Sequence, residues 1–261
     1  MKTLVMMMVA SVIGLMAVAN PANKPTIVLV HGAWSDASAW KNVTPLLKAK
    51  GFEVITVNLP GHGTDKTPFA GITLQSYVDV VKKEIGDRKN IILVGHSMAG
   101  VVISQVAEDL PKNIKKLVYL AAYLPENGQS LLDLAKTDAE SHVGKFLHID
   151  QATASAAIGK EGVVDIFVAD APESIQTQFS NGVNPDPLVP FVSPVKLTNE
   201  NFGSVEKVYV FTKNDHAVSY PKQQEMAKAG KINKEYTLLS SHTPFISMPQ
   251  EVATILLKEA K

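Results

Sequence analysis

The sequence predicts an α/β fold, in which a mostly parallel sheet carries helices on both faces and an inserted cap covers one end of the sheet. Short apolar runs of strand type alternate with segments of helical periodicity along most of the chain. This alternation implies helical crossovers between parallel strands. The chain has 261 residues, of which 46% are hydrophobic, and this suits one domain with a large core.

The predicted elements follow one another in a regular order. Strands are expected where β-branched and other apolar residues run together, at 25–30, 52–57, 91–94, 114–121, 207–211 and 235–239. Helices are expected where apolar residues recur with helical spacing, at 35–50, 74–85, 101–110, 221–229 and 249–258.

The strand and helix rhythm breaks between about 123 and 198. This region has short helical pieces at 131–135, 163–169 and 173–179 and a proline-rich stretch, with no clear parallel strand. It still carries many apolar side chains that need burial. We therefore expect a cap folded over one end of the sheet, inserted into a single domain of residues 20–261.

The first 19 residues differ from everything that follows. Lys2 precedes an apolar run from Leu4 to Val18, and Ala17-Val18-Ala19 has the pattern of a cleavage site. This layout predicts a secretory signal, whereas a membrane anchor would need roughly 20 apolar residues. We expect an exported protein, periplasmic or secreted by a bacterium, without a stable membrane anchor. The absence of cysteine rules out a disulfide framework and a thiol nucleophile.

The charge balance limits the classes of partner. The chain has 25 basic and 25 acidic side chains, and they are scattered rather than grouped. Neither a basic patch for nucleic acid nor a charged tail is indicated, so we expect no nucleic-acid partner.

Residues 90–100 carry the most specific motif, Asn-Ile-Ile-Leu-Val-Gly-His-Ser-Met-Ala-Gly. It reads as a strand, a sharp turn with Ser97 on it, and a helix, which is the layout of a nucleophile elbow. Small residues are needed two positions either side of the serine, where Gly95 and Ala99 stand, and Gly100 is expected to leave room for adjustment. The alternative interpretation is a serine that caps an ordinary helix.

Asp215 and His242 are the candidate partners of Ser97. Each lies just beyond the end of a predicted parallel strand, where open α/β sheets place their ligands. A serine needs an adjacent base, and the base needs an acid that orients it. Should the acid lie elsewhere, Glu126 is the next candidate. The other histidines, His31, His62, His96, His142, His148 and His216, are not expected to act as the base.

Together these residues resemble the branch of the α/β-hydrolase superfamily that includes plant methylesterases, hydroxynitrile lyases and bacterial pyrethroid-type carboxylesterases. The matching stretches span nearly the whole mature chain: 28–34, 58–63, 93–97, 119–125, Asp215 with Tyr220-Pro221 and Gln224, and 241–249. The cap between Asn127 and Pro194 matches poorly. The resemblance implies a hydrolase without cofactor or metal that cleaves small carboxylic esters through an acyl-serine intermediate. A ligand-binding protein with a vestigial triad remains an alternative.

The fold of this superfamily also implies an oxyanion hole. Its donors are the backbone N–H after the nucleophile, on Met98, and one from the first loop, where Ala33 stands. Gly32 lets that loop approach closely. Trp34 and His96 are expected to contact the substrate. No spacing of the H-E-x-x-H kind is present, so no metal is expected.

Two positions bear on the alternative of cyanohydrin cleavage. Lyase relatives carry a lysine directly after the catalytic histidine and a threonine directly after the first-loop histidine. Thr243 and Gly32 stand at these positions here. The sequence therefore favours ester hydrolysis over cyanohydrin cleavage.

The N-terminal segment leads to a first prediction. The mature protein should begin at about Asn20, because Ala17-Val18-Ala19 ends the apolar run in the pattern that signal peptidase accepts. N-terminal sequencing of the exported protein checks this. Recovery of the intact chain, with Met1, in a membrane pellet would contradict it.

Overall fold

The computed structural model describes residues 24–261, so the predicted signal segment lies outside the described residues. A six-stranded sheet forms the centre, with the strand order β2-β1-β3-β4-β8-β9 and every neighbouring pair parallel. The strands are β1 (Thr26–Val30), β2 (Val54–Val57), β3 (Ile91–His96), β4 (Ile114–Leu120), β8 (Glu206–Thr212) and β9 (Glu235–Leu238). The predicted α/β class is confirmed.

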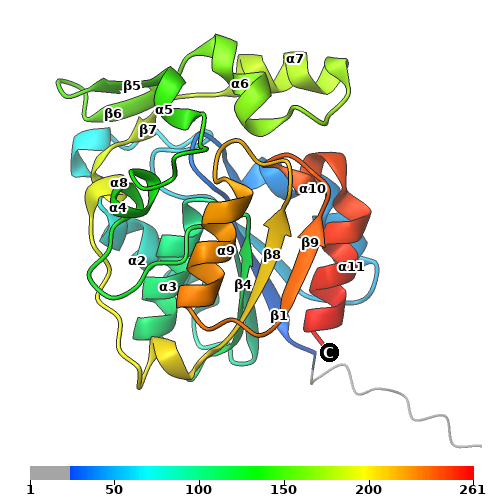
Figure 1. Cartoon of the computed structure of the whole chain (residues 1–261). Coiled ribbons are helices and arrows are strands. Elements are labelled where there is room, and N and C mark those ends of the chain that lie inside the picture. The colour runs from blue at the N-terminus through cyan, green and yellow to red at the C-terminus, as the bar shows by residue number, and fades with distance from the viewer. Residues whose placement is uncertain (1–23) are drawn as a thin grey trace, which may run out of the picture.

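Helices cover both faces of the sheet (Figure 1). One face carries α2 (Leu74–Ile85), α3 (Ala99–Asp109) and α9 (Tyr220–Ala229), and the other carries α1 (Thr44–Lys48), α10 (Pro244–Ser247) and α11 (Pro249–Glu259). In β1, Val28 and Val30 face the first layer, and Ile27 and Leu29 face the second. Both faces of the strand are buried, so its sequence is continuously apolar instead of alternating.

The helix expected at 35–50 is interrupted. A 3₁₀-helix, Ala37–Asn42, is followed by the short α1, which has Pro45 in its first turn. A proline there lacks the N–H that an unbroken helix would require from it, so it is compatible with a helix start but not with a helix interior.

Within the segment between β4 and β8, residues 143–182 lie over the carboxyl ends of the strands, and the chain after residue 193 runs back along the side of the molecule to β8 (Figure 1). The helices of this segment are α4 (Leu131–Ala135), α5 (Val143–Phe146), α6 (Lys160–Phe167), α7 (Glu173–Gly182) and α8 (Val189–Val192). It also contains a small antiparallel sheet that the sequence did not predict, of strands β5 (Leu147–Asp150), β6 (Ser155–Ile158) and β7 (Asp186–Pro187). We call residues 123–198 the cap. Within residues 24–261, no helix is both long and apolar enough to cross a membrane.

The sequence predicts that Gly100 leaves spare room at the turn between β3 and α3, and the structure differs from this prediction. A Cβ added to Gly95 would lie 2.8 Å from the carbonyl oxygen of Ala99, as the motif requires. A Cβ added to Gly100 would lie only 2.1 Å from the carbonyl oxygen of Tyr123. Gly100 therefore leaves no spare room, because the chain after β4 passes directly against it.

Replacing Gly100 tests this contact. Gly100→Ala should lower the free energy of unfolding by about 1–3 kcal/mol, since the methyl group forces the backbone at Tyr123 to move. Gly182→Ala is the matched control, because Gly182 is also helical but has no atom within 4 Å of an added Cβ. Urea denaturation of both variants measures the difference. Equal stability of the two variants would show that the contact is not constraining.

Candidate active site

Ser97 lies in a sharp turn between β3 and α3. Its φ is 54°, in the left-handed region that non-glycine residues rarely adopt. The turn is held from both sides, because the N–H of Ser97 donates to Leu120 O at 3.2 Å and its carbonyl accepts from the N–H of Tyr123 at 3.1 Å. The end of β4 and the chain directly after it thus fix the backbone of the serine in a strained conformation.

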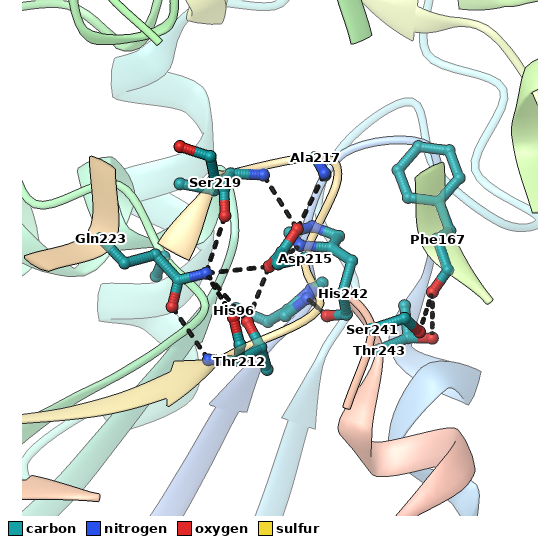
Figure 2. A network of polar contacts seen from close by, with 12 residues as sticks. His96, Phe167, Thr212, Asp215, Ala217, Ser219, Gln223, Ser241, His242 and Thr243 are labelled. Atoms are coloured by element: carbon teal, nitrogen blue, oxygen red, sulfur yellow. Dashed lines mark hydrogen bonds and ion pairs between the residues drawn. The ribbon is translucent and has the colours of Figure 1, made fainter. Parts of the chain in front are cut away.

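His242 and Asp215 form a buried pair on the loops after β9 and β8. His242 Nδ1 lies 2.8 Å from Asp215 Oδ2, and their side chains are 1% and 0% exposed. Further donors hold the carboxylate (Figure 2). They are Thr212 Oγ1 at 2.7 Å and Gln223 Nε2 at 3.1 Å on Oδ2, with the Ala217 and Val218 N–H groups at 2.8 and 2.9 Å on Oδ1. The aspartate can therefore orient the imidazole.

His96 connects this pair to the serine turn. It directly precedes Ser97, its ring centroid lies 4.6 Å from that of His242, and its Nε2 donates to the His242 carbonyl at 2.9 Å. Burial and the neighbouring His242 ring hold the pKa of His96 well below 6.5. His96 is thus neutral and joins the two loops. Its ring also lines a small pocket together with His242. His96 is therefore placed next to the predicted base.

Ala33 and Met98, the predicted oxyanion donors, belong to two segments that meet at the serine turn. A Cβ added to Gly32 would lie 2.8 Å from Ser97 Cβ, so the loop after β1 passes directly against the serine turn. Met98 is the N-cap residue directly before α3, at the helix end where backbone N–H groups have no acceptor within the helix. The arrangement brings backbone from two segments beside Ser97.

An aromatic pocket adjoins these residues. It is lined by Ala33, Trp34, Ser35, His96, Phe167, Phe179, His242, Thr243 and Phe245. Trp34 has a φ of 54°, and its Nε1 donates to the Ala156 carbonyl of the cap at 3.0 Å. Trp34 and Phe179 also line a neighbouring cavity of about 230 Å³. The cap thus supplies part of the wall beside His242.

The cap also holds the loop of His242 on both sides. The Ser241 N–H donates to Asp170 Oδ2 at 3.1 Å, and the Ser241 hydroxyl donates to the other oxygen of that carboxylate. The Thr243 hydroxyl donates to the Phe167 carbonyl at 2.7 Å (Figure 2). Sequence reasoning missed Asp170, because it lies in a turn of the cap with no motif around it.

Gln223 and Thr212 were missed as well. The stretch that carried the family resemblance includes Gln224, but that residue is exposed, while Gln223 is fully buried against Asp215. Thr212 is the last residue of β8, three residues before the acid. A polar residue at the end of an apolar strand, close to the predicted acid, is the feature of the sequence that could have identified Thr212.

Comparisons with known proteins identify the family. The Alpha/beta hydrolase family matches residues 27–255, and the chain belongs to that family. "Putative methylesterase 11, chloroplastic" from Arabidopsis thaliana is 31% identical over 249 residues, covering 90% of this chain and 63% of that protein. The chain spans about 55–63% of the length of the first three curated relatives from this plant.

Two solved structures show the same fold. Polyneuridine aldehyde esterase superposes with a TM-score of 0.81 at 20% identity, covering 92% of this chain and 100% of that one. A pyrethroid hydrolase from Sphingobium faniae JZ-2 gives 0.78 at 22% identity, covering 90% and 97%. The resemblance to methylesterases and pyrethroid hydrolases is confirmed.

His31 holds the loop after β1 through its two ring nitrogens. Its Nδ1 donates to Gly32 O at 2.8 Å, and its Nε2 accepts the Leu59 N–H at 3.1 Å. Burial, with a smaller effect of His62, lowers the pKa of His31 from 6.5 to about 3. Protonation of Nε2 would remove the acceptor for Leu59, so the folded state keeps this ring neutral.

The pKa of His31 gives a prediction with a definite sign. Between pH values of about 6.5 and 3 the unfolded chain binds the extra proton, so this histidine destabilises the fold as the pH falls, by about 1.4 kcal/mol per pH unit. His31→Gln should make the pH dependence of the unfolding free energy shallower by up to that amount. Urea denaturation from about pH 6 to pH 4 measures it. His148→Gln, at an exposed histidine of the cap, is the control and should keep the original slope. An unchanged slope in His31→Gln would contradict the assignment.

Proposed function

We propose that this protein hydrolyses carboxylic esters through an acyl-enzyme on Ser97. The observation that carries the proposal is the contact chain from Asp215 through His242 and His96 to the strained turn of Ser97. An oriented base beside a serine is the arrangement that activates a hydroxyl nucleophile. The names of the relatives, a methylesterase, an esterase and a pyrethroid hydrolase, support the same reaction class.

In the first half of the reaction, Ser97 Oγ attacks the ester carbonyl carbon while His242 Nε2 takes its proton. The His242 Nδ1–H bond to Asp215 keeps Nε2 free as the acceptor and stabilises the imidazolium. Negative charge develops on the carbonyl oxygen, and the N–H groups of Ala33 and Met98 stabilise it. Each such donor contributes roughly 3 kcal/mol. The C–O bond then breaks, and the alcohol leaves with the proton from His242.

Deacylation repeats these steps with water. His242 Nε2 takes a proton from the water, whose oxygen attacks the acyl carbon. The bond to Ser97 Oγ breaks, the proton returns to the serine, and the carboxylic acid is released. Each residue ends the cycle in its starting state.

The lining of the pocket beside His242 favours uncharged esters with an apolar group as substrates. The pocket itself has a volume of only about 10 Å³, so the side chains between it and the neighbouring cavity of about 230 Å³ must move to admit such a group. Apart from Ser35 and the two histidines, its lining is apolar or has its hydroxyl already engaged, as for Thr243. Trp34, Phe167 and Phe179 present aromatic surface that binds flat apolar groups. A charged acyl or alcohol group would lose its hydration there without gaining a partner.

Cyanohydrin cleavage is the competing chemistry. It requires a cation beside the departing cyanide, and the residue after His242 is Thr243, whose hydroxyl is bound to the cap. Incubation with mandelonitrile and with phenyl acetate at one enzyme concentration distinguishes the two reactions. Cyanide release above the uncatalysed rate without phenol would reverse the assignment. Tight binding of an ester without turnover would instead favour a binding protein with a vestigial triad.

Substitutions at the three proposed catalytic residues test the mechanism. Ser97→Ala and His242→Ala should each lower kcat by about 10⁴–10⁶-fold, because the residues act as a unit. Asp215→Asn should lower kcat by about 10⁴-fold through loss of imidazole orientation. The readout is hydrolysis of p-nitrophenyl acetate, with circular dichroism to establish that each variant folds.

Glu126→Gln is the matched control at the alternative acid. Glu126 is exposed, and it lines a separate cavity with Leu124, Lys207 and Lys234. This variant should keep the kcat of the parent protein. A near-normal kcat in Asp215→Asn, together with a large loss in Glu126→Gln, would move the acid to Glu126.

A further inference from the structure

Two histidines and one aspartate meet at the junction of the cap with the loop of Asp215. His142 Nδ1 lies 2.6 Å from Asp165 Oδ2, and His216 Nδ1 lies 2.8 Å from Asp165 Oδ1. His142 immediately precedes α5, Asp165 lies on α6, and His216 directly follows Asp215. The proposed ester hydrolysis uses none of the three.

The backbone beneath these side chains is fixed. The His142 N–H donates to the His216 carbonyl at 2.8 Å, and the Ser141 hydroxyl donates to the Ala217 carbonyl at 2.8 Å. The two imidazole rings lie 4.3 Å apart between centroids. Both histidines are therefore positioned before any ligand binds, which lowers the entropy cost of binding.

The donor set is one that transition metals prefer. Two imidazole nitrogens and a carboxylate oxygen suit Zn²⁺ and similar divalent ions, and a water completes a tetrahedral shell. One ligand atom from each residue lies within 4.8 Å of the others. Ligands of a tetrahedral Zn²⁺ stand roughly 3.3 Å apart. The two Nδ1 atoms, which contact different oxygens of Asp165, must therefore move outward by roughly half an ångström, and ligand atoms separated by up to 4.8 Å must come closer together.

The cluster is accessible to an ion. The side chains of His142, Asp165 and His216 are 29%, 41% and 39% exposed. Both histidines line a surface cavity of about 440 Å³. Glu140 lines the same cavity and adds a negative charge. Lys145 and Lys213 also line it, and their positive charges weaken the attraction for a cation. Both lysines are exposed, so their side chains can extend into solvent.

We propose that His142, Asp165 and His216 form a binding site for a divalent transition metal ion of the Zn²⁺ type, which ties the cap to the loop that carries Asp215. Each imidazole binds the ion through a deprotonated Nδ1, so a neutral ring moves its proton to Nε2 and a protonated ring releases one proton to water. Two nitrogen–metal bonds and one oxygen–metal bond then replace the two hydrogen bonds to Asp165. The site joins α5 and α6 of the cap to the segment after β8. It does not depend on the proposed ester hydrolysis.

Metal titration of the protein purified without a polyhistidine tag tests the proposal. Calorimetry with ZnCl₂ should give one bound equivalent, and Zn²⁺ should raise the Tm. CoCl₂ should give the intense visible absorption bands of a tetrahedral Co²⁺ site. Binding well below one equivalent, or Co²⁺ spectra of the octahedral aqueous type, would overturn the proposal and leave the cluster a hydrogen-bonded latch.

Variants locate the site. Asp165→Asn, His142→Asn and His216→Asn should each weaken Zn²⁺ binding at least about tenfold, because each removes one ligand. An asparagine amide can still donate to Asp165 from near the Nδ1 position, so the histidine variants keep the latch and the fold. His148→Asn, at an exposed cap histidine outside the cluster, should bind Zn²⁺ like the parent protein. Parent-like binding in both histidine variants, or its loss in His148→Asn, would overturn the proposal.

Discussion

The close approach of backbone segments around Ser97 is the constraint on which the site depends. The loop after β1, the turn after β3 and the chain after β4 meet there, and the glycines at positions 32, 95 and 100 stand where a Cβ would collide with a neighbour. The sheet order explains this convergence, because β1 and β4 flank β3. The crowding excludes other arrangements of the turn and so holds the serine in its left-handed conformation.

Much of this arrangement could be predicted from the sequence. The central strands are largely apolar runs buried on both faces, whereas the edge strand β9 is mostly exposed or half-buried. Ser97, Asp215 and His242 each follow a strand that the sequence predicts. The residues that surround the site were harder to find. Gln223 and Gln224 are neighbours on α9, and only the helix rotation in the folded protein decides which one faces Asp215.

The cap was predictable as a region but not in its structure. Its strands β5, β6 and β7 are four, four and two residues long, and the last contains Pro187, so no alternation of apolar residues marks them. The cluster of His142, Asp165 and His216 has no sequence signature, because its members come from three elements and meet only in the tertiary structure. A buried pair that joins the loop after β2 to the cap, His62 and Asp186, arises in the same way. Burial disfavours the charged imidazole, but Asp186 outweighs it and raises the pKa of His62.

The hydrogen bonds from the cap to the residues on either side of His242 have a mechanical consequence. Asp170 and the carbonyl of Phe167 hold Ser241 and Thr243, so the cap cannot lift away at this point without releasing the loop of the base. In the proposed mechanism, an open molecule would lose the alignment of its proton acceptor. Ser97 would then be reactive only while the cap is closed over it. A bulky molecule that holds the cap open would find the serine without an aligned base. Substrates would then be selected by size through the contacts between the cap and the loop of His242, and not only by the walls of the pocket.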